Sequence, residues 1–305
     1  MQDIINLQIE IFMLIFIGYT LGKKGILDKS TRSKLTTMVL SVVLPFAIVK
    51  SFNMQLTKDI LVSTGLVLII SFLIQLGYHI VNQFLYNHLD QDRKIVSQYA
   101  TMVSNAGFMG MPVSEAAFGS TGLLYASIFL IPQRIFMWSA GLSLFTSVSK
   151  KELIKKVATH PCIIAIYIGL ICMLLRSLGV VFPDFVTMSI NSVASCNTGL
   201  SMIIIGAILS DVPWSEFLDY QAIRYSILRL VILPLILLFI LLAFHIPTDS
   251  IQVCVLLTGM PAASTAAMLA QSYDHNPGYA SKLIFVSTVL SLITLPVWLV
   301  VLKSI

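Results

Sequence analysis

The sequence predicts an all-α polytopic membrane protein. Of its 305 residues, 57% are hydrophobic and only 11% are charged, and the mean hydropathy is +0.91. Soluble globular domains carry about 25% charged residues, so this chain has too little polar surface to cover a water-soluble particle of its size. Ten apolar segments and a weak internal repeat add detail to this prediction. The lipid bilayer is therefore the expected solvent for most of the chain.

Ten segments are long and apolar enough to be read as spans, for which a helix needs about 20 mainly apolar residues. They cover roughly residues 5–22, 33–52, 60–80, 94–118, 121–147, 160–180, 185–209, 220–244, 250–272 and 278–302. The connections are short, and none is large enough for a soluble domain. The N-terminus lacks the basic region of a cleaved signal peptide, so the first segment is expected to remain as a span.

Basic residues collect in alternate connections and set the expected orientation. The first, third and fifth connections hold most of the lysines and arginines, whereas the other side has little beyond Lys50, Lys58 and Lys303. Because cytoplasmic loops are enriched in these residues, the odd connections are expected in the cytoplasm and both termini outside the cell membrane. The net charge of +5 is explained by this orientation, so no nucleic-acid partner is expected.

A short internal repeat divides the chain near its middle. The tripeptide Gly-Met-Pro at 110–112 recurs at 259–261, and Tyr-Ala-Ser at 125–127 recurs at 279–281. The offsets are 149 and 154 residues, close to half the chain. Each half would hold five spans, and an odd number makes the second half enter the membrane from the opposite face. Such inverted repeats are typical of alternating-access carriers, whose site lies between the halves near the bilayer midplane.

Two spans carry helix-breaking residues in their middle. The fourth contains Gly107, Gly110 and Pro112, and the ninth contains Gly259 and Pro261. Proline cannot donate a backbone hydrogen bond, and glycine eases unwinding. Unwound backbone at this depth is tolerated only where protein or a water-filled cavity satisfies its polar groups.

Pro112 and Pro261 are expected to begin the second half of each broken helix, because proline suits the first helical position. The helix N-termini would then present free N–H groups and partial positive charge to the midplane, which predicts an anion site. A proline kink alone would explain one such helix. Two in matching positions favour a binding site.

Polar side chains near the breaks are candidate ligands for the anion. Asn105 precedes the first break, where its amide suits a carboxylate or an ion; an interhelical hydrogen bond is the alternative. Ser264 and Thr265 follow the second break. Arg134 lies in the middle of the fifth span, and its planar guanidinium matches a carboxylate.

Two further charged residues have open roles. Glu115 follows Pro112 by one turn and could bind a proton or a sodium ion, or could stabilise the positive end of its own half-helix. Arg134 and Arg229 could each pair with Glu115 instead of meeting substrate. Arg229 is expected to snorkel to the nearby cytoplasmic interface. The histidines and cysteines have no metal-ligand spacing, so neither a metal nor another cofactor is expected.

The residues resemble a known family. The pattern Asn105-x-Gly107-x-x-Gly110-x-Pro112 is similar to the fourth-helix motif of the auxin efflux carrier family. The C-terminal stretch is similar too, at Met260-Pro261, Tyr273-Asp274, Ala280-Ser281, Ser287-Thr288 and Thr294-Leu295-Pro296. The resemblance covers essentially the whole chain. The long central loop of the plant members is absent, which favours the bacterial malate and malonate permease branch.

The resemblance implies a fold and an activity. Two inverted five-helix repeats, 1–150 and 151–305, would cross at Pro112 and Pro261, and the family's binding asparagine maps onto Asn105. Helices one, two, six and seven would form a scaffold that can pair in a homodimer, and helices three to five and eight to ten would form a moving transport unit. The implied substrate is a small carboxylate, carried by elevator-type alternating access. After Pro261 the chain departs from the plant pattern, so auxin is not expected as substrate.

Other functions remain as alternatives. Transport could be uniport, or could be coupled to H⁺ through Glu115. A sodium-coupled symporter, as in the related bile-acid symporters, would use Asn105, Glu115, Ser264 and Thr265 for the ion. An intramembrane enzyme is disfavoured, because no paired carboxylates, metal-type histidine cluster or Ser/His dyad lies at a consistent depth. A channel would show flux without saturation.

Overall fold

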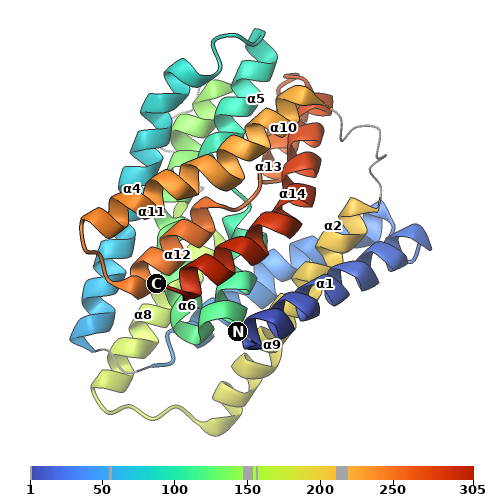
Figure 1. The fold of residues 1–305 in the computed structure, drawn as a ribbon. Helices are drawn as coiled ribbons and strands as arrows, with labels where there is room; N and C mark the ends of the chain where they lie inside the picture. Colours follow the sequence, from blue (N-terminus) through green and yellow to red (C-terminus); the bar gives the residue numbers. More distant parts are fainter. Residues whose placement is uncertain (1, 55–56, 147–153, 156, 211–218) are drawn as a thin grey trace.

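The computed structural model describes residues 2–54, 57–146, 154–155, 157–210 and 219–305, and the regular elements of these residues are all helical (Figure 1). Their order is α1 (Gln2–Lys23), α2 (Lys29–Met38), η1 (Val39–Val43), α3 (Leu44–Ser51), α4 (Lys58–Leu85), α5 (Gln91–Met102), η2 (Ala106–Gly110), α6 (Met111–Phe136), η3 (Met137–Gly141), η4 (Leu142–Leu144), α8 (Pro161–Ser177), α9 (Asp184–Leu209), α10 (Tyr220–Ile227), η6 (Leu228–Ile232), α11 (Leu233–Ala243), α12 (Thr248–Thr258), α13 (Thr265–Ser272) and α14 (Pro277–Lys303).

Six helical stretches of the described chain are long and apolar enough to span a bilayer. They are Lys29–Ser51, Lys58–Leu85, Ala106–Leu144, Asp184–Leu209, Tyr220–Ala243 and Pro277–Lys303. Shorter apolar helices include Pro161–Ser177 and Thr248–Thr258. The prediction of an all-α, multi-pass chain therefore holds. The ten predicted spans are not recovered one by one, because the fourth and ninth are broken near the middle and the fourth and fifth join in one stretch at Gly119.

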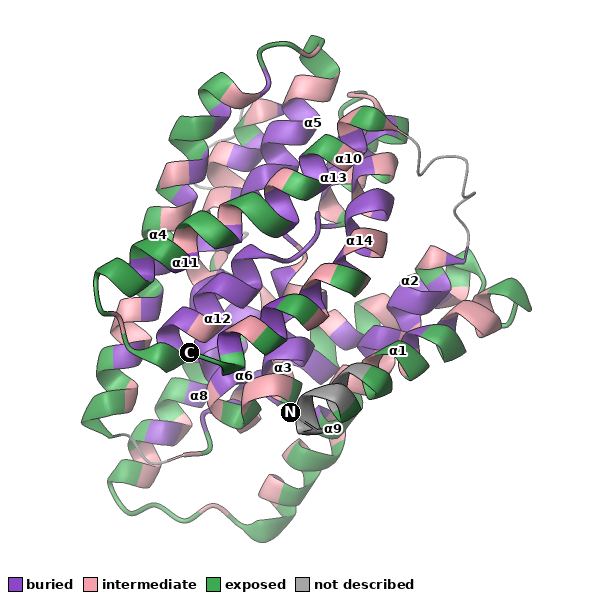
Figure 2. Cartoon of the chain, viewed as in Figure 1, coloured by how far each residue is buried: buried purple, intermediate pink, exposed green. Residues whose placement is uncertain are grey.

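The outward faces of the helices are apolar, as a lipid environment requires. Exposed residues line the outer sides of α4, α8 and α11 (Figure 2). On α4 they include Ile69, Phe72 and Leu73, and on α11 Phe239, which is 63% exposed. A soluble protein rarely exposes apolar patches of this extent, so these faces fit contact with acyl chains.

Helices α1 and α9 pack side by side through small residues (Figure 1). A Cβ atom on Gly18 of α1 would collide with the carbonyl of Ile203, and one on Gly206 of α9 would collide with the carbonyl of Ile15. In α1, Gly18 and Gly22 form a small-xxx-small pattern, which lets two helix backbones approach closely in a membrane. Glycine at these positions therefore allows the close packing of α1 on α9.

Three prolines inside helical stretches are each preceded by a π-helical turn. The π-helical turns η1, η2 and η6 end two residues before Pro45, Pro112 and Pro234, respectively. A proline has no N–H to donate, and its ring clashes with the carbonyl four residues earlier. A π turn shifts the hydrogen bonds by one residue and relieves that clash without ending the helix. The helices therefore continue through these prolines.

Candidate functional site

The first break separates α5 from η2. Helix α5 ends at Met102, the next residue Val103 has an extended backbone (φ −117°, ψ 98°), and η2 begins after Asn105. Gln133 of α6 supports this turn, because its amide donates to the Ser104 carbonyl at 2.8 Å. The helix after the break thus starts at Ala106, earlier than the predicted start at Pro112. Pro112 lies inside a continuous η2–α6 helix, for which the π turn at η2 is the physical reason.

The second break separates α12 from α13. Gly259 ends α12, and α13 begins at Thr265. Pro261 therefore lies inside the extended segment between the two helices, and the prediction that it begins the second half-helix is wrong. The repeated Gly-Met-Pro tripeptides also occupy different places, since one follows its break and the other is part of it.

The two breaks lie against each other and satisfy each other's backbone. Asn105 donates its N–H to the Pro261 carbonyl at 2.8 Å, and Ala263 donates to the Val103 carbonyl at 3.3 Å. Ser104 and Ala262 form an antiparallel bridge between them. Non-helical backbone at membrane depth needs such partners. The two broken helices therefore cross at these short non-helical segments, with Pro261 at the contact and Pro112 outside it.

Arg229 connects the C-terminal ends of α5 and α12, the helices that precede the two breaks. It is 2% exposed, and its guanidinium donates to the Thr101 carbonyl at 2.9 Å and to the Met260 carbonyl at 3.1 Å. The guanidinium also lies over the Tyr78 ring, 5.2 Å from its centroid. A cation is favourable where helices α5 and α12 end, because unpaired carbonyls carry partial negative charge there. The prediction that Arg229 snorkels to the interface is therefore wrong.

Arg134 lies beside the first turn of η2. A Cβ atom on Gly107 would be 3.5 Å from its Nη2 atom. Its Nη1 atom donates to Nε2 of His160 at 2.7 Å, and its Nε atom is buried without a partner among the described residues. The structure thus brings Arg134 and Gly107 together. It does not pair Arg134 or Arg229 with Glu115, which corrects that alternative.

Glu115 has other partners. Its Oε1 atom is 3.4 Å from Nζ of Lys50 on α3, and its Oε2 atom accepts from the Asn197 amide of α9 at 3.4 Å. Glu115 is partly buried. The carboxylate therefore links α6 to α3 and α9 at a place separate from the Asn105 side chain.

A cavity of about 370 Å³ lies at the crossing. Asn105 and Ser264 line it, together with Lys29 from the start of α2. Its remaining walls are largely apolar, with Phe108 and Phe285 among them. Residues that carry an amide, a hydroxyl and an ammonium group thus line one space together with hydrophobic side chains. Binding sites for small organic molecules commonly have this composition.

The other predicted site residues have structural contacts. Thr265 accepts a hydrogen bond from the Tyr99 hydroxyl at 3.1 Å. Gly110 faces α12, where a Cβ atom would be 2.6 Å from Cδ2 of Leu257. Sequence reasoning missed Lys29, because it belongs to a connection in which five basic residues were attributed to orientation alone. It also missed the role of Arg229, although a buried arginine within a span is itself a signal.

The fold and the crossing define a class of helical membrane protein with two broken helices around a central cavity. A family model described as membrane transport protein matches residues 3–299. The chain belongs to this family, the auxin efflux carrier family of membrane transporters.

Two archaeal relatives match over nearly the whole chain. An uncharacterized transporter of Methanothermobacter thermautotrophicus is 28% identical over 306 residues, covering 96% of this chain and 97% of the relative. An uncharacterized transporter of Methanocaldococcus jannaschii is 24% identical over 301 residues, covering 94% and 95%.

Proposed function

We propose that the protein is a secondary transporter for a small organic anion, a carboxylate such as malate or malonate. The cavity shared by Asn105, Ser264 and Lys29 carries this proposal. An ammonium group attracts a carboxylate, and the amide and hydroxyl can donate hydrogen bonds to it. Helix η2 begins after the first break and α13 after the second, and their N-termini add partial positive charge. Arg134, beside Gly107 but not among the residues that line the cavity, would add a second positive charge near η2.

The proposed mechanism is alternating access of the elevator type. The cavity lies between α2, η1 and α9 on one side and the breaks, α13 and α14 on the other. We infer that the first side belongs to the scaffold of helices one, two, six and seven, and the second to the transport unit. Lys29 and Ser281 line the cavity and belong to expected cytoplasmic ends, so this conformation would be open to the cytoplasm.

The inverted repeat of 1–150 and 151–305 remains part of the proposal. Two helices that break and cross near the middle of the fold are consistent with paired discontinuous helices around a carrier site. The cell membrane, termini outside and a homodimer through the scaffold helices belong to the same proposal. Exposed apolar residues such as Phe16 of α1 and Ile171 of α8 are available for that dimer contact.

Glu115 is the proposed coupling residue. It connects the transport side, through α6, to Lys50 and Asn197 on the scaffold side. Protonation would remove its charge and weaken the Lys50 contact, which would ease movement between the two sides. Sodium coupling is the second candidate, because the Asn197 Oδ1 and Ser114 Oγ atoms are buried acceptors without partners among the described residues.

Ligand-induced stabilisation of the purified protein tests this function. A ligand that binds only the native state raises the apparent stability by mass action. We expect malate, malonate or another small carboxylate to raise the unfolding temperature, and Lys29→Gln to reduce the effect. Lys24→Gln, an exposed cation outside the cavity, is the matched control.

The outcome also separates the two candidates. Stabilisation by sodium alone, without a carboxylate, would favour the symporter. Carboxylate stabilisation that is equal in Lys29→Gln and Lys24→Gln would contradict the proposed site.

A further inference from the structure

A second cavity, separate from the crossing, has a volume of about 330 Å³. It lies between the end of α4, the helix α10–η6 and the start of α14, and its lining includes His88, Arg224 and Tyr279. Its apolar wall includes Ile227 and Ile232, which are 48% and 41% exposed. The cavity is therefore open towards the surface that contacts lipid.

Arg224 lines this cavity and forms no ion pair with a carboxylate of the described residues. Its hydrogen-bond partner among the described residues is His88, whose Nε2 atom is 3.5 Å from Nη1 of Arg224. Arginine can only donate hydrogen bonds, so His88 accepts this one. Most of the five N–H donors of the Arg224 guanidinium remain for another acceptor.

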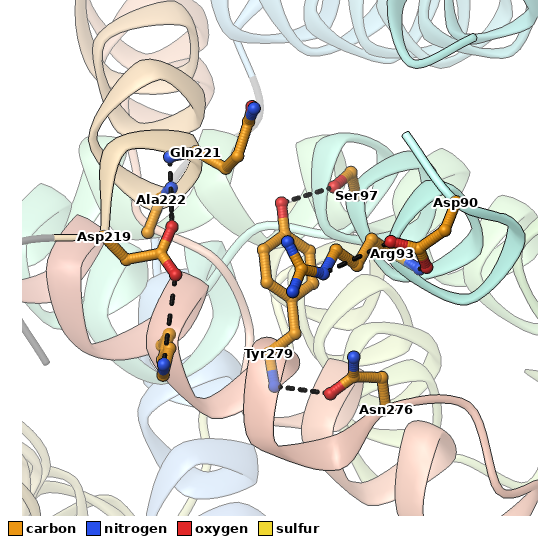
Figure 3. Close-up of polar contacts among 9 residues, drawn as sticks. Asp90, Arg93, Ser97, Asp219, Gln221, Ala222, Asn276 and Tyr279 are labelled. Atoms are coloured by element: carbon orange, nitrogen blue, oxygen red, sulfur yellow. Dashed lines mark hydrogen bonds and ion pairs between the residues drawn. The ribbon is translucent and has the colours of Figure 1, made fainter. Parts of the chain in front are cut away.

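The carboxylates nearby are held by other groups (Figure 3). Asp219 caps α10 through the N–H groups of Gln221 and Ala222, and it is 3.9 Å from Nζ of Lys282. Asp90 caps α5 and is 3.3 Å from Nε of Arg93.

Tyr279 forms a fixed wall beside Arg224. The Arg93 guanidinium lies over the Tyr279 ring, 5.3 Å from its centroid, and the ring's hydroxyl is 3.2 Å from the Ser97 hydroxyl (Figure 3). These contacts hold Arg93 and Tyr279 in place and leave Arg224 as the group able to receive an anion.

The order of side chains along α10–η6 matches a lipid. Arg224 lies near the capped start of α10, and Ile227 and Ile232 follow along the same helix. At 1.5 Å per residue, Ile232 is about 12 Å farther along the axis than Arg224. Tyr220, 72% exposed, lies at the same end as Arg224, where aromatic residues favour the membrane–water interface. A charged group at the interface is thus followed by an apolar groove that leads into the bilayer.

We propose that this cavity binds the phosphate headgroup of an anionic phospholipid, with Arg224 as the phosphate ligand and Ile227 and Ile232 against the start of an acyl chain. Basic pockets between helices on the cytoplasmic side are suited to such headgroups. A zwitterionic lipid fits less well, because Asp219 and Asp90 are already engaged and offer little to a choline group. The site is independent of the proposed substrate.

The test uses the purified full chain in detergent. Its unfolding temperature is followed against dioctanoyl phosphatidylglycerol, dioctanoyl phosphatidylcholine and free glycerol phosphate, for the wild type, Arg224→Gln and Lys24→Gln. We expect the wild type and Lys24→Gln to be stabilised by the phosphatidylglycerol at about five-fold lower concentration than by the phosphatidylcholine. Arg224→Gln should lose this preference.

His88→Glu is the second variant, in case Arg224→Gln does not fold. His88 is exposed, and a carboxylate in its place would pair with Arg224 and repel an anionic headgroup. Retention of the phosphatidylglycerol preference in either variant would overturn the proposal. Equal stabilisation by the two lipids would also overturn it. If glycerol phosphate matches the phosphatidylglycerol, the occupant is a soluble phosphate compound and the lipid assignment is wrong.

Discussion

The backbone N–H of Asn105 donates to the carbonyl of Pro261 at 2.8 Å, and this bond joins two helix breaks from opposite halves of the chain. The side chain of Asn105 takes no part in this bond, because the backbone N–H is the donor. It can therefore line the cavity together with Ser264 and Lys29. The backbone of Asn105 thus holds the two breaks together, and its side chain has the proposed role in binding. A substitution of the side chain therefore tests binding and keeps the backbone bond.

Replacement of Arg229 should destabilise the crossing. Arg229→Leu would leave the Thr101 and Met260 carbonyls buried without their charged donor. Hydrogen bonds to charged groups contribute about 1.5–3 kcal/mol each, so the unfolding temperature should fall well below that of the wild type. Arg229→Lys should lose less, since an ammonium can still donate. Arg176→Leu is the control: it removes a partly exposed arginine that lies over Phe182, and we expect little change in the unfolding temperature. A normal unfolding temperature for Arg229→Leu would refute this role.

Glycine at position 206 should be required for the packing of α1 on α9. In Gly206→Ala the new Cβ would meet the Ile15 backbone, which cannot move without shifting the helix. Overpacking of this kind costs about 1–3 kcal/mol. Gly199→Ala on the same helix is the matched control, because no atom lies within 4 Å of its Cβ position. Thermal unfolding in detergent compares the two, and equal stability would show that the helices are not in close contact.

The ion pair of Lys50 and Glu115 should contribute modestly to stability. Both side chains are partly exposed, at 30% and 18%, and the N–O distance is 3.4 Å. A double-mutant cycle with Lys50→Gln and Glu115→Gln should give a coupling free energy of about 0.2–1 kcal/mol. A much larger coupling would mean that the pair is shielded from water. No coupling would mean that the contact is not populated.

The orientation of the chain predicts the side from which a cavity residue is reached. Ser281→Cys, in a background without Cys172 and Cys196, should react with a membrane-impermeant thiol reagent from the cytoplasmic side. Ser281 is exposed and lines the cavity. Asn53→Cys, an exposed position at the opposite end, should react only from outside. Reversed labelling would contradict the expected topology.

The class of fold was predictable because it depends on composition. A chain with 11% charged residues cannot cover itself in water, and this requires no knowledge of contacts. Glycine and proline also located the broken segments to within a few residues. The start of each second half-helix was predicted wrongly at Pro112 and Pro261. A π turn before Pro112 keeps that helix continuous, and sequence periodicity does not reveal a shift of one residue in the hydrogen bonds.

The partners of individual side chains were less predictable. Arg229 contacts carbonyls 31 and 128 residues away along the chain, and such contacts depend on how distant helices pack. The same holds for Lys29, which lies in a basic connection and yet faces the cavity. Asn105 and Ser264 were predicted as ligands because they adjoin the breaks, where local sequence alone fixes their position. Their role in binding stays a prediction.

Exchange of labelled malate or malonate by the protein in liposomes tests the central claim most directly. Asn105→Ala keeps the backbone bond to Pro261 and removes only the amide that lines the cavity. We expect the wild type to exchange one of these carboxylates with saturation, and Asn105→Ala to lose about ten-fold or more of that activity. Asn87→Ala, an exposed asparagine whose amide bonds to the Gln83 carbonyl, should behave as the wild type. Exchange by Asn105→Ala at the wild-type rate would contradict a substrate site at the crossing.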